Sequence, residues 1–159
     1  MKRFLLLILL IPVLTLSSCG EPPTIRTDFS ALFSANHTET DYAGTVAKDG
    51  DHLTITMTEP YTVKGMVFEY ADTQLSIRKL GHSAEAKADY LPMESIPTAL
   101  RNALLYLPQA RCSGSENGCD HYTVDTPYGE AALTASDGYL TEITEPHSGI
   151  TFHFESDNP

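Results

Sequence analysis

Residues 42–60 read YAGTVAKDGDHLTITMTEP, and this stretch decides the fold class of the chain. Leu53, Ile55 and Met57 alternate with threonines, which gives an extended segment one apolar face and one hydroxyl face. The dipeptide Asp49-Gly50 favours a tight hairpin turn before this run, because glycine readily adopts a positive φ. The proline at the end of the stretch lacks an N–H and cannot continue the ladder. The stretch therefore predicts two antiparallel strands.

The same alternation of apolar and polar residues recurs to the end of the chain, with a second Asp-Gly turn at Asp137-Gly138. Further strands are expected in segments 63–70, 75–77, 122–124, 131–133, 139–143 and 150–155. Within 139–143 we expect Tyr139, Thr141 and Ile143 to share one face. Residues 81–90 fit either an exposed strand or the edge of a helix.

Two segments have the spacing of helices. Asp28 precedes Phe29, Leu32 and Phe33, whose spacing of i, i+3 and i+4 predicts a short amphipathic helix. A longer helix is expected to begin at Ser95-Ile96-Pro97 and to end before Pro108. Its apolar stripe consists of Ile96, Leu100, Ala103, Leu104 and Leu107. We therefore expect an α+β fold of about eight antiparallel strands and two or so helices, in a single domain at residues 28–159.

The N-terminus has the plan of an export signal. Lys2 and Arg3 precede an apolar run at residues 4–14, which is about 16 Å long as a helix and too short to cross a bilayer. The following Leu16-Ser17-Ser18-Cys19 resembles the lipobox of bacterial lipoproteins. The resemblance implies a signal peptide at 1–18, a diacylglycerol on Cys19, a tether at 19–27 and a location on the extracytoplasmic side of the cell envelope. The alternative is a secreted protein in which Cys19 is incidental.

The charge of the chain excludes two classes of partner. Without Lys2 and Arg3, eight basic residues face 21 acidic ones, a net charge of −13. Such a surface repels nucleic acid and anionic lipid headgroups. Contact with the membrane is therefore expected through the N-terminal lipid alone.

Cys112 and Cys119 remain as an even pair once Cys19 is lipidated. Six small or polar residues separate them, so a flexible surface loop closed by a disulfide is the favoured interpretation in an oxidising compartment. The alternatives are a redox-active pair and a metal site with His121. The redox pair would lack the usual C-x-x-C spacing, and the metal site would lack an obvious fourth ligand.

No catalytic or metal-binding motif stands out. The six histidines form no paired helical ligand set, and the Asp-Gly pairs do not continue into a calcium-binding loop. The chain also has no nucleophile elbow and no glycine-rich phosphate loop. We expect a protein that is not an enzyme, with no metal and no cofactor.

The order of these segments resembles one family. Tyr42-Ala43-Gly44, the run from Leu53 to Met57, Glu59-Pro60 and the run from Val63 to Phe68, followed by a helix that begins with proline, resemble the lipoprotein-carrier superfamily (LolA/LolB-like). The resemblance implies a curved antiparallel sheet, an incomplete barrel, with helices over its apolar concave side.

Two functions follow from this interpretation. The first is a carrier-like module for an apolar or acyl ligand, because flexible Met and Phe side chains suit the wall of such a cavity. The expected cavity residues are Leu53, Ile55, Met57, Met66, Phe68, Leu75, Ile77, Leu100 and Leu104. These residues could equally pack against the helix and leave no cavity. The second function is a tethered adaptor that binds another envelope protein without a ligand cavity.

Overall fold

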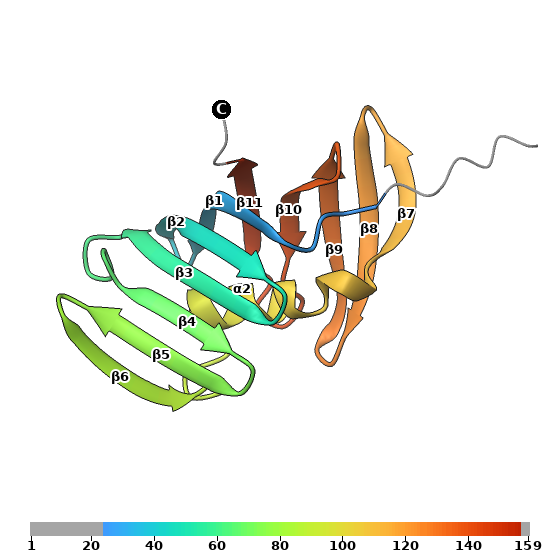
Figure 1. The fold of residues 1–159 in the computed structure, drawn as a ribbon. Helices are drawn as coiled ribbons and strands as arrows, with labels where there is room; N and C mark the ends of the chain where they lie inside the picture. Colours follow the sequence, from blue (N-terminus) through green and yellow to red (C-terminus); the bar gives the residue numbers. More distant parts are fainter. Residues whose placement is uncertain (1–23, 157–159) are drawn as a thin grey trace, which may run out of the picture.

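The computed structural model describes residues 24–156, and these residues form one 11-stranded antiparallel sheet with an α-helix on one face (Figure 1). The strands are β1 (Phe29–His37), β2 (Thr40–Asp49), β3 (His52–Glu59), β4 (Val67–Ala71), β5 (Gln74–Lys79), β6 (His82–Lys87), β7 (Arg111–Glu116), β8 (Cys119–Thr126), β9 (Gly129–Ser136), β10 (Tyr139–Thr144) and β11 (Thr151–Ser156). The helix is α2 (Ile96–Leu105), which is followed by a 3₁₀ turn, η1 (Leu107–Gln109).

The sheet consists of two meanders joined in the middle. Its strand order is β6-β5-β4-β3-β2-β1-β11-β10-β9-β8-β7, so every neighbour except the β1–β11 pair is consecutive in sequence. The chain leaves the outer strand β6, passes through α2 and enters the opposite outer strand β7. Figure 1 shows the strands of the two meanders running in different directions, with α2 lying across the inside of the bend. We call β1–β6 the first half and β7–β11 the second half.

The expected number of elements was wrong: the described part of the chain has 11 strands and one α-helix, rather than about eight strands and two helices. The helix predicted from Asp28 to Phe33 is part of β1, in which Ala31, Phe33 and Ala35 are buried and Leu32 is 42% exposed. Phe29 and Phe33 fit a period of two as well as a helical period. Pairing with β2 on one side and β11 on the other satisfies the backbone of the strand and decides between the two periods.

The segment that contains the two cysteines is also regular structure. Asn117 and Gly118 both have positive φ values, 54° and 81°, and they form the two-residue turn of a hairpin between β7 and β8. Asn-Gly is a strong signal for such a turn, because both central positions need this conformation. The loop expected at 112–119 is therefore replaced by parts of two strands, and the ambiguous residues 81–90 contain β6.

Other expectations were confirmed. Asp137 and Gly138 form a turn with φ values of 52° and 79°, and β2 and β3 pair around the turn after Asp49. The helix begins after Ser95, with Pro97 in its first turn, where a missing N–H costs no hydrogen bond.

The face expected for 139–143 was wrong. A register shift between Leu140 and Glu142 interrupts the alternation, so Leu140 and Ile143 are buried while Tyr139 is exposed. The Arg26 guanidinium lies 4.1 Å from the centroid of the Tyr139 ring, and the Arg26 N–H donates to the Gly138 carbonyl at 2.8 Å. Residues 24–27, expected to be tether, therefore contact the turn between β9 and β10.

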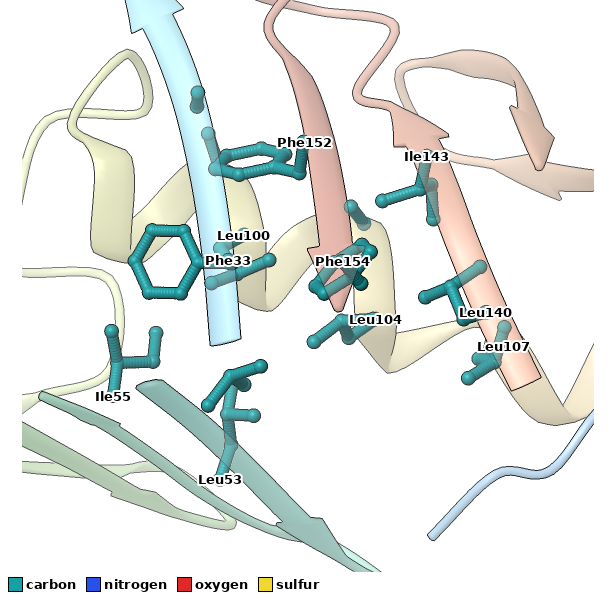
Figure 2. Close-up of a cluster of buried hydrophobic side chains, with 14 of the residues drawn as sticks. Phe33, Leu53, Ile55, Leu100, Leu104, Leu107, Leu140, Ile143, Phe152 and Phe154 are labelled. Atoms are coloured by element: carbon teal, nitrogen blue, oxygen red, sulfur yellow. The ribbon is translucent and has the colours of Figure 1, made fainter. Parts of the chain in front are cut away.

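The core lies between α2 and the seam where β1 meets β11 (Figure 2). Phe33 and Phe152 pack edge to face across this seam with ring centroids 6.2 Å apart, and Leu100 and Leu104 of α2 are fully buried against it. Gly44 lies opposite Phe33, where a Cβ would be 2.3 Å from the Thr56 carbonyl oxygen, so this position admits no side chain. None of the helices in residues 24–156 has the length and hydropathy to cross a bilayer.

Candidate functional site

The nine residues expected to line one cavity lie on the concave face of the sheet and on the helix that covers it, but they do not surround one space. Seven of them are buried in the core: Leu53, Ile55, Met57, Phe68, Leu75, Leu100 and Leu104. Met66 and Ile77 are partly buried and pack against that core. Ile55 of β3 and Leu100 of α2, each 0% exposed, fill the space between the sheet and the helix. The concave face is therefore filled in the middle, and open space remains at the two ends of the helix.

An apolar cavity of about 280 Å³ lies beside the first turn of α2. Its lining residues are His37, Tyr42, Met57, Val63, Met66, Phe68, Ile77, Leu91, Glu94, Ser95, Ile96 and Pro97. Four of these residues, Met57, Met66, Phe68 and Ile77, were expected from the sequence. The wall is almost entirely carbon and sulfur, with polar groups confined to a few positions, which is typical of a site for an apolar ligand.

The register of the first half explains why these side chains meet. Ile55, Phe68 and Ile77 lie opposite one another on β3, β4 and β5 and so share one face of the sheet. Beyond β3 the chain folds back on itself: the Met57 N–H donates to the Met66 carbonyl at 2.9 Å and the Gly65 N–H donates to the Met57 carbonyl at 2.8 Å. This loop adds Val63 and Met66 to the wall of the cavity.

Other lining residues were not expected from the sequence to belong to the cavity. Leu91 lies in the irregular connection between β6 and α2, which has no periodicity. Ile96 and Pro97 were recognised as the start of a helix, but nothing in the sequence indicated which strands that helix would cover. Their part in the cavity depends on tertiary packing.

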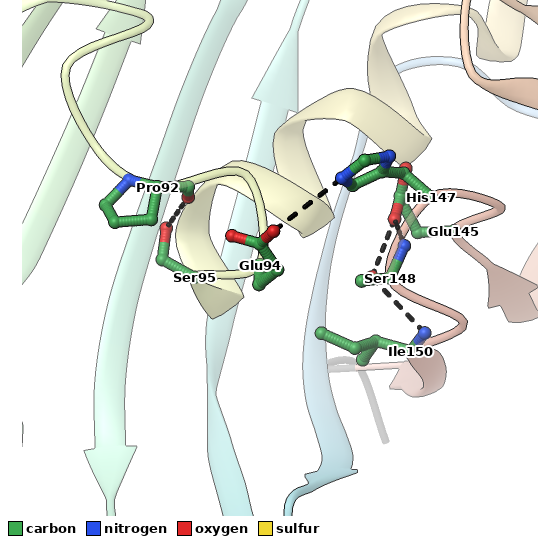
Figure 3. A network of polar contacts seen from close by, with 7 residues as sticks. All are labelled: Pro92, Glu94, Ser95, Glu145, His147, Ser148 and Ile150. Carbon is green, nitrogen blue, oxygen red and sulfur yellow. Dashed lines mark hydrogen bonds and ion pairs between the residues drawn. The ribbon is translucent and has the colours of Figure 1, made fainter.

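Polar contacts fix the start of α2, which forms one side of the cavity (Figure 3). Ser95 Oγ donates to the Pro92 carbonyl at 2.7 Å and lies 2.9 Å from Thr98 Oγ1. Glu94 Oε1 lies 3.7 Å from His147 Nε2, in the connection between β10 and β11. The first turn of the helix is thus tied to the second half of the sheet.

The connection that carries His147 is itself held by a buried carboxylate. Glu145 is 1% exposed, and its Oε2 accepts hydrogen bonds from the Ser148 N–H at 2.7 Å and from Ser148 Oγ at 2.6 Å. Ser148 Oγ also accepts a hydrogen bond from the Ile150 N–H at 3.3 Å. These bonds close a compact turn, and Figure 3 shows it beside the helix.

A second space, of about 460 Å³, lies at the other end of α2, and we call it the polar pocket. It includes Leu53 and Leu104, but its character is set by charged groups. Lys48 is 8% exposed, and its Nζ donates to the Gly50 carbonyl at 2.8 Å and lies 4.0 Å from Asp28 Oδ1. This lysine is therefore already occupied by groups of its own chain.

Tyr70 forms part of the polar pocket, and its ring faces the Arg101 guanidinium at 5.3 Å from centroid to carbon. Burial raises the pKa of Tyr70, and the positive charge of Arg101 opposes this shift. The apolar cavity and the polar pocket share no lining residue. The residues expected to line a single cavity therefore border separate spaces of different character.

The disulfide expected between Cys112 and Cys119 is absent, and both residues are free thiols. Cys119 of β8 lies opposite Glu116 of β7. Cys112 lies four residues before Glu116 on β7, where it is opposite Tyr122. That separation is about 10–13 Å along a strand. A disulfide needs Cα atoms within about 7 Å of each other, so this register keeps the two thiols apart.

Within residues 24–156 no group of three or more His, Cys, Asp and Glu side chains has the arrangement of a metal site. His147 and His153 each lie near one carboxylate, Glu94 and Glu142 respectively. Cys19, the expected site of lipidation, lies outside the described residues.

Comparison with known proteins identifies the fold. Neither protein-family models nor curated protein sequences match this chain. Among solved structures, the crystal structure of a LolA superfamily protein from Nitrosomonas europaea is similar, with a TM-score of 0.50 and 12% sequence identity over 84% of this chain and 86% of that one. The chain thus has a LolA-like fold, and the resemblance seen in the sequence holds at the level of the fold.

Proposed function

We propose that this protein is a lipid-anchored, extracytoplasmic carrier-like module that binds an apolar or acyl ligand in the apolar cavity beside α2. The observation that carries the proposal is the cavity itself, because an open space lined by Met57, Met66, Phe68 and Ile77 exposes apolar surface that a ligand would cover. The LolA-like fold is consistent with such a role. The proposal is a binding function and assigns no catalytic residue.

The size and chemistry of the cavity indicate the kind of ligand. Small-molecule sites have volumes of roughly 300–1,000 Å³, and this cavity of about 280 Å³ is at the lower limit. It therefore suits one segment of an acyl chain better than a large amphiphile. Each buried methylene contributes about 0.8 kcal/mol, and the flexible thioethers of Met57 and Met66 can adapt to different chains.

The second part of the proposal is the lipid anchor on Cys19. It rests on the basic start, the short apolar run and the lipobox-like sequence before the cysteine. Mass spectrometry of the N-terminal peptide from the native protein tests it. We expect a chain that begins at Cys19 and carries a diacylglycerol, whereas an unmodified N-terminus or a cytosolic location would contradict the anchor.

The ligand is best tested in the intact, membrane-associated protein with a photoactivatable fatty acid. We expect the crosslinked sites to be concentrated on peptides that contain Met57, Met66 or Phe68, and an excess of unlabelled palmitate to suppress the labelling. Labelling spread evenly along the chain would contradict a specific site.

Two substitutions separate filling of the cavity from a general effect of a large side chain. Met66→Trp fills the cavity and should abolish most of the labelling. Leu32→Trp, on the opposite face of the sheet and 42% exposed, is the matched control and should leave labelling unchanged. If both variants label like the wild type, while protein crosslinking recovers one dominant partner, the adaptor function replaces the carrier function.

A further inference from the structure

Strand β6 is an open edge of the sheet. It is the last strand in the order and pairs with β5 along its whole length, from Gln74 opposite Lys87 to Lys79 opposite His82. All of its residues are exposed or partly exposed. Every second N–H and C=O group of such a strand points outward, so the edge is ready to pair with another strand.

The opposite edge, β7, is different. A register shift between Cys112 and Gly114 marks a bulge, which bends a strand and prevents regular pairing on its outer side. The pairing of β6 with β5 has no such shift, and β6 contains no proline. Of the two edges of this sheet, β6 is the one that can continue the ladder.

The sequence of β6 is complementary to itself. In an antiparallel pair of two copies centred on Ala86, Glu85 of each copy lies opposite Lys87 of the other. The two-fold axis generates the Glu–Lys pair twice, and opposite charges at facing positions stabilise adjacent strands. A second copy of the chain therefore supplies the complementary charges automatically.

Strand β6 ends at Lys87, whose carbonyl accepts a hydrogen bond from the Tyr90 N–H at 3.0 Å in the turn that follows. The facing residues of the two copies are therefore Glu85, Ala86 and Lys87.

We propose that two copies of this chain associate edge to edge through β6, as an antiparallel, two-fold symmetric pair centred on Ala86. The interface is one strand wide and falls in the small, transient class. This assembly goes beyond the ligand-binding function and does not depend on it, because β6 contributes no side chain to the apolar cavity.

Disulfide trapping tests the geometry in the full-length protein, with Cys112 and Cys119 replaced by Ser. Ala86→Cys places a thiol on the two-fold axis and should yield a covalent dimer under mild oxidation. Ser115→Cys, an exposed position on the edge strand β7, is the matched control and should crosslink at least about tenfold more slowly, because only proximity raises the effective concentration of a thiol. Equal rates at the two positions would mean random collision and overturn the proposal.

Charge exchange tests the register. Glu85→Lys or Lys87→Glu places two like-charged pairs across the interface and should weaken the dimer about fivefold each, as measured by sedimentation and by the yield of trapping. The double variant exchanges the charges and should recover the wild-type association. A protein that stays monomeric at high concentration, or single variants that associate like the wild type, would overturn the proposal. Growth into long polymers would indicate pairing of β6 with β7 instead.

Discussion

The two halves of the sheet are built alike but packed differently. Each is a meander of consecutive hairpins, and they meet where β1 pairs with β11. In the second half, small and medium side chains on the concave face are almost fully buried, with Ala131, Leu133 and Ala135 at 0–2% exposure. In the first half, Met66 and Ile77 remain partly exposed around the apolar cavity.

The difference follows from the size of the only α-helix in the described chain. With ten residues, α2 is about 15 Å long, which is too short to cover 11 strands. It covers the seam, and Leu107 of η1, 1% exposed, continues the packing onto the second half. Part of the first half is left without cover, as Figure 1 shows for the strands furthest from the helix. One short helix thus divides a uniform sheet into a filled half and a half with room for a ligand.

The largest effect is expected at the seam, since both halves depend on it. Phe152→Ala removes a fully buried ring that packs against Phe33, and the free energy of unfolding should fall by about 3–5 kcal/mol. Denaturant unfolding followed by two probes, one in each half, measures this. The two probes should report one shared transition. Two separate transitions would show that the halves fold independently.

A pair of truncations tests the difference in packing directly. Leu133→Ala in the filled half should cost about 2–5 kcal/mol, because it leaves a void among buried side chains. Met66→Ala in the half with the cavity should cost markedly less, since its side chain is partly exposed and borders open space. Equal losses of unfolding free energy in the two variants would contradict the comparison.

Each half also contains one buried tyrosine, Tyr70 in the first and Tyr122 in the second. Burial raises the pKa of both above the ordinary value of 10.0; nearby Asp120 raises the pKa of Tyr122 further, and Arg101 opposes the shift of Tyr70. The unfolded chain therefore loses these protons at lower pH than the folded one, and stability should fall as the pH rises above about 10. Ultraviolet titration should show that two of the eight tyrosines ionise at higher pH than the others. One of these two ionisations should be missing in Tyr70→Phe and the other in Tyr122→Phe.

The smallest effect is expected for the ion pair that ties the start of α2 to the second half. Glu94 and His147 are both substantially exposed, so a double-mutant cycle of Glu94→Gln and His147→Gln should give a coupling of about 0–1 kcal/mol. A coupling well above this range would mean that the pair, rather than the buried face of the helix, holds α2 in place.

Local rules predicted much of the fold. The turns after Asp49 and at Asp137-Gly138, the alternation of Leu53, Ile55 and Met57, and the helix after Ser95 all follow from the conformational preferences of a few residues. The same rules failed where two patterns coincided. Phe29 and Phe33 satisfy both a helical and a strand period, and the polar run between Cys112 and Cys119 contains the Asn-Gly turn that makes it a hairpin.

The candidate site, like the fold, was predicted only in part. The sequence identified Met57, Met66, Phe68 and Ile77 as residues of the concave face, and they line the apolar cavity. It could not show that Ile55 and Leu100 would fill the centre of that face, or that Leu91 and Pro97 would complete the wall. Those outcomes depend on where the helix lies on the sheet.

The sequence by itself determined the antiparallel class of the sheet, its two Asp-Gly turns and the apolar face of strands such as β3, because these depend on residues close together in the chain. Tertiary structure alone decided that β1 is a strand, that it pairs with β11, and that the apolar cavity is separate from the polar pocket. Those features arise from contacts between residues more than a hundred positions apart, such as Phe33 and Phe152, and from how much of the sheet a ten-residue helix can cover.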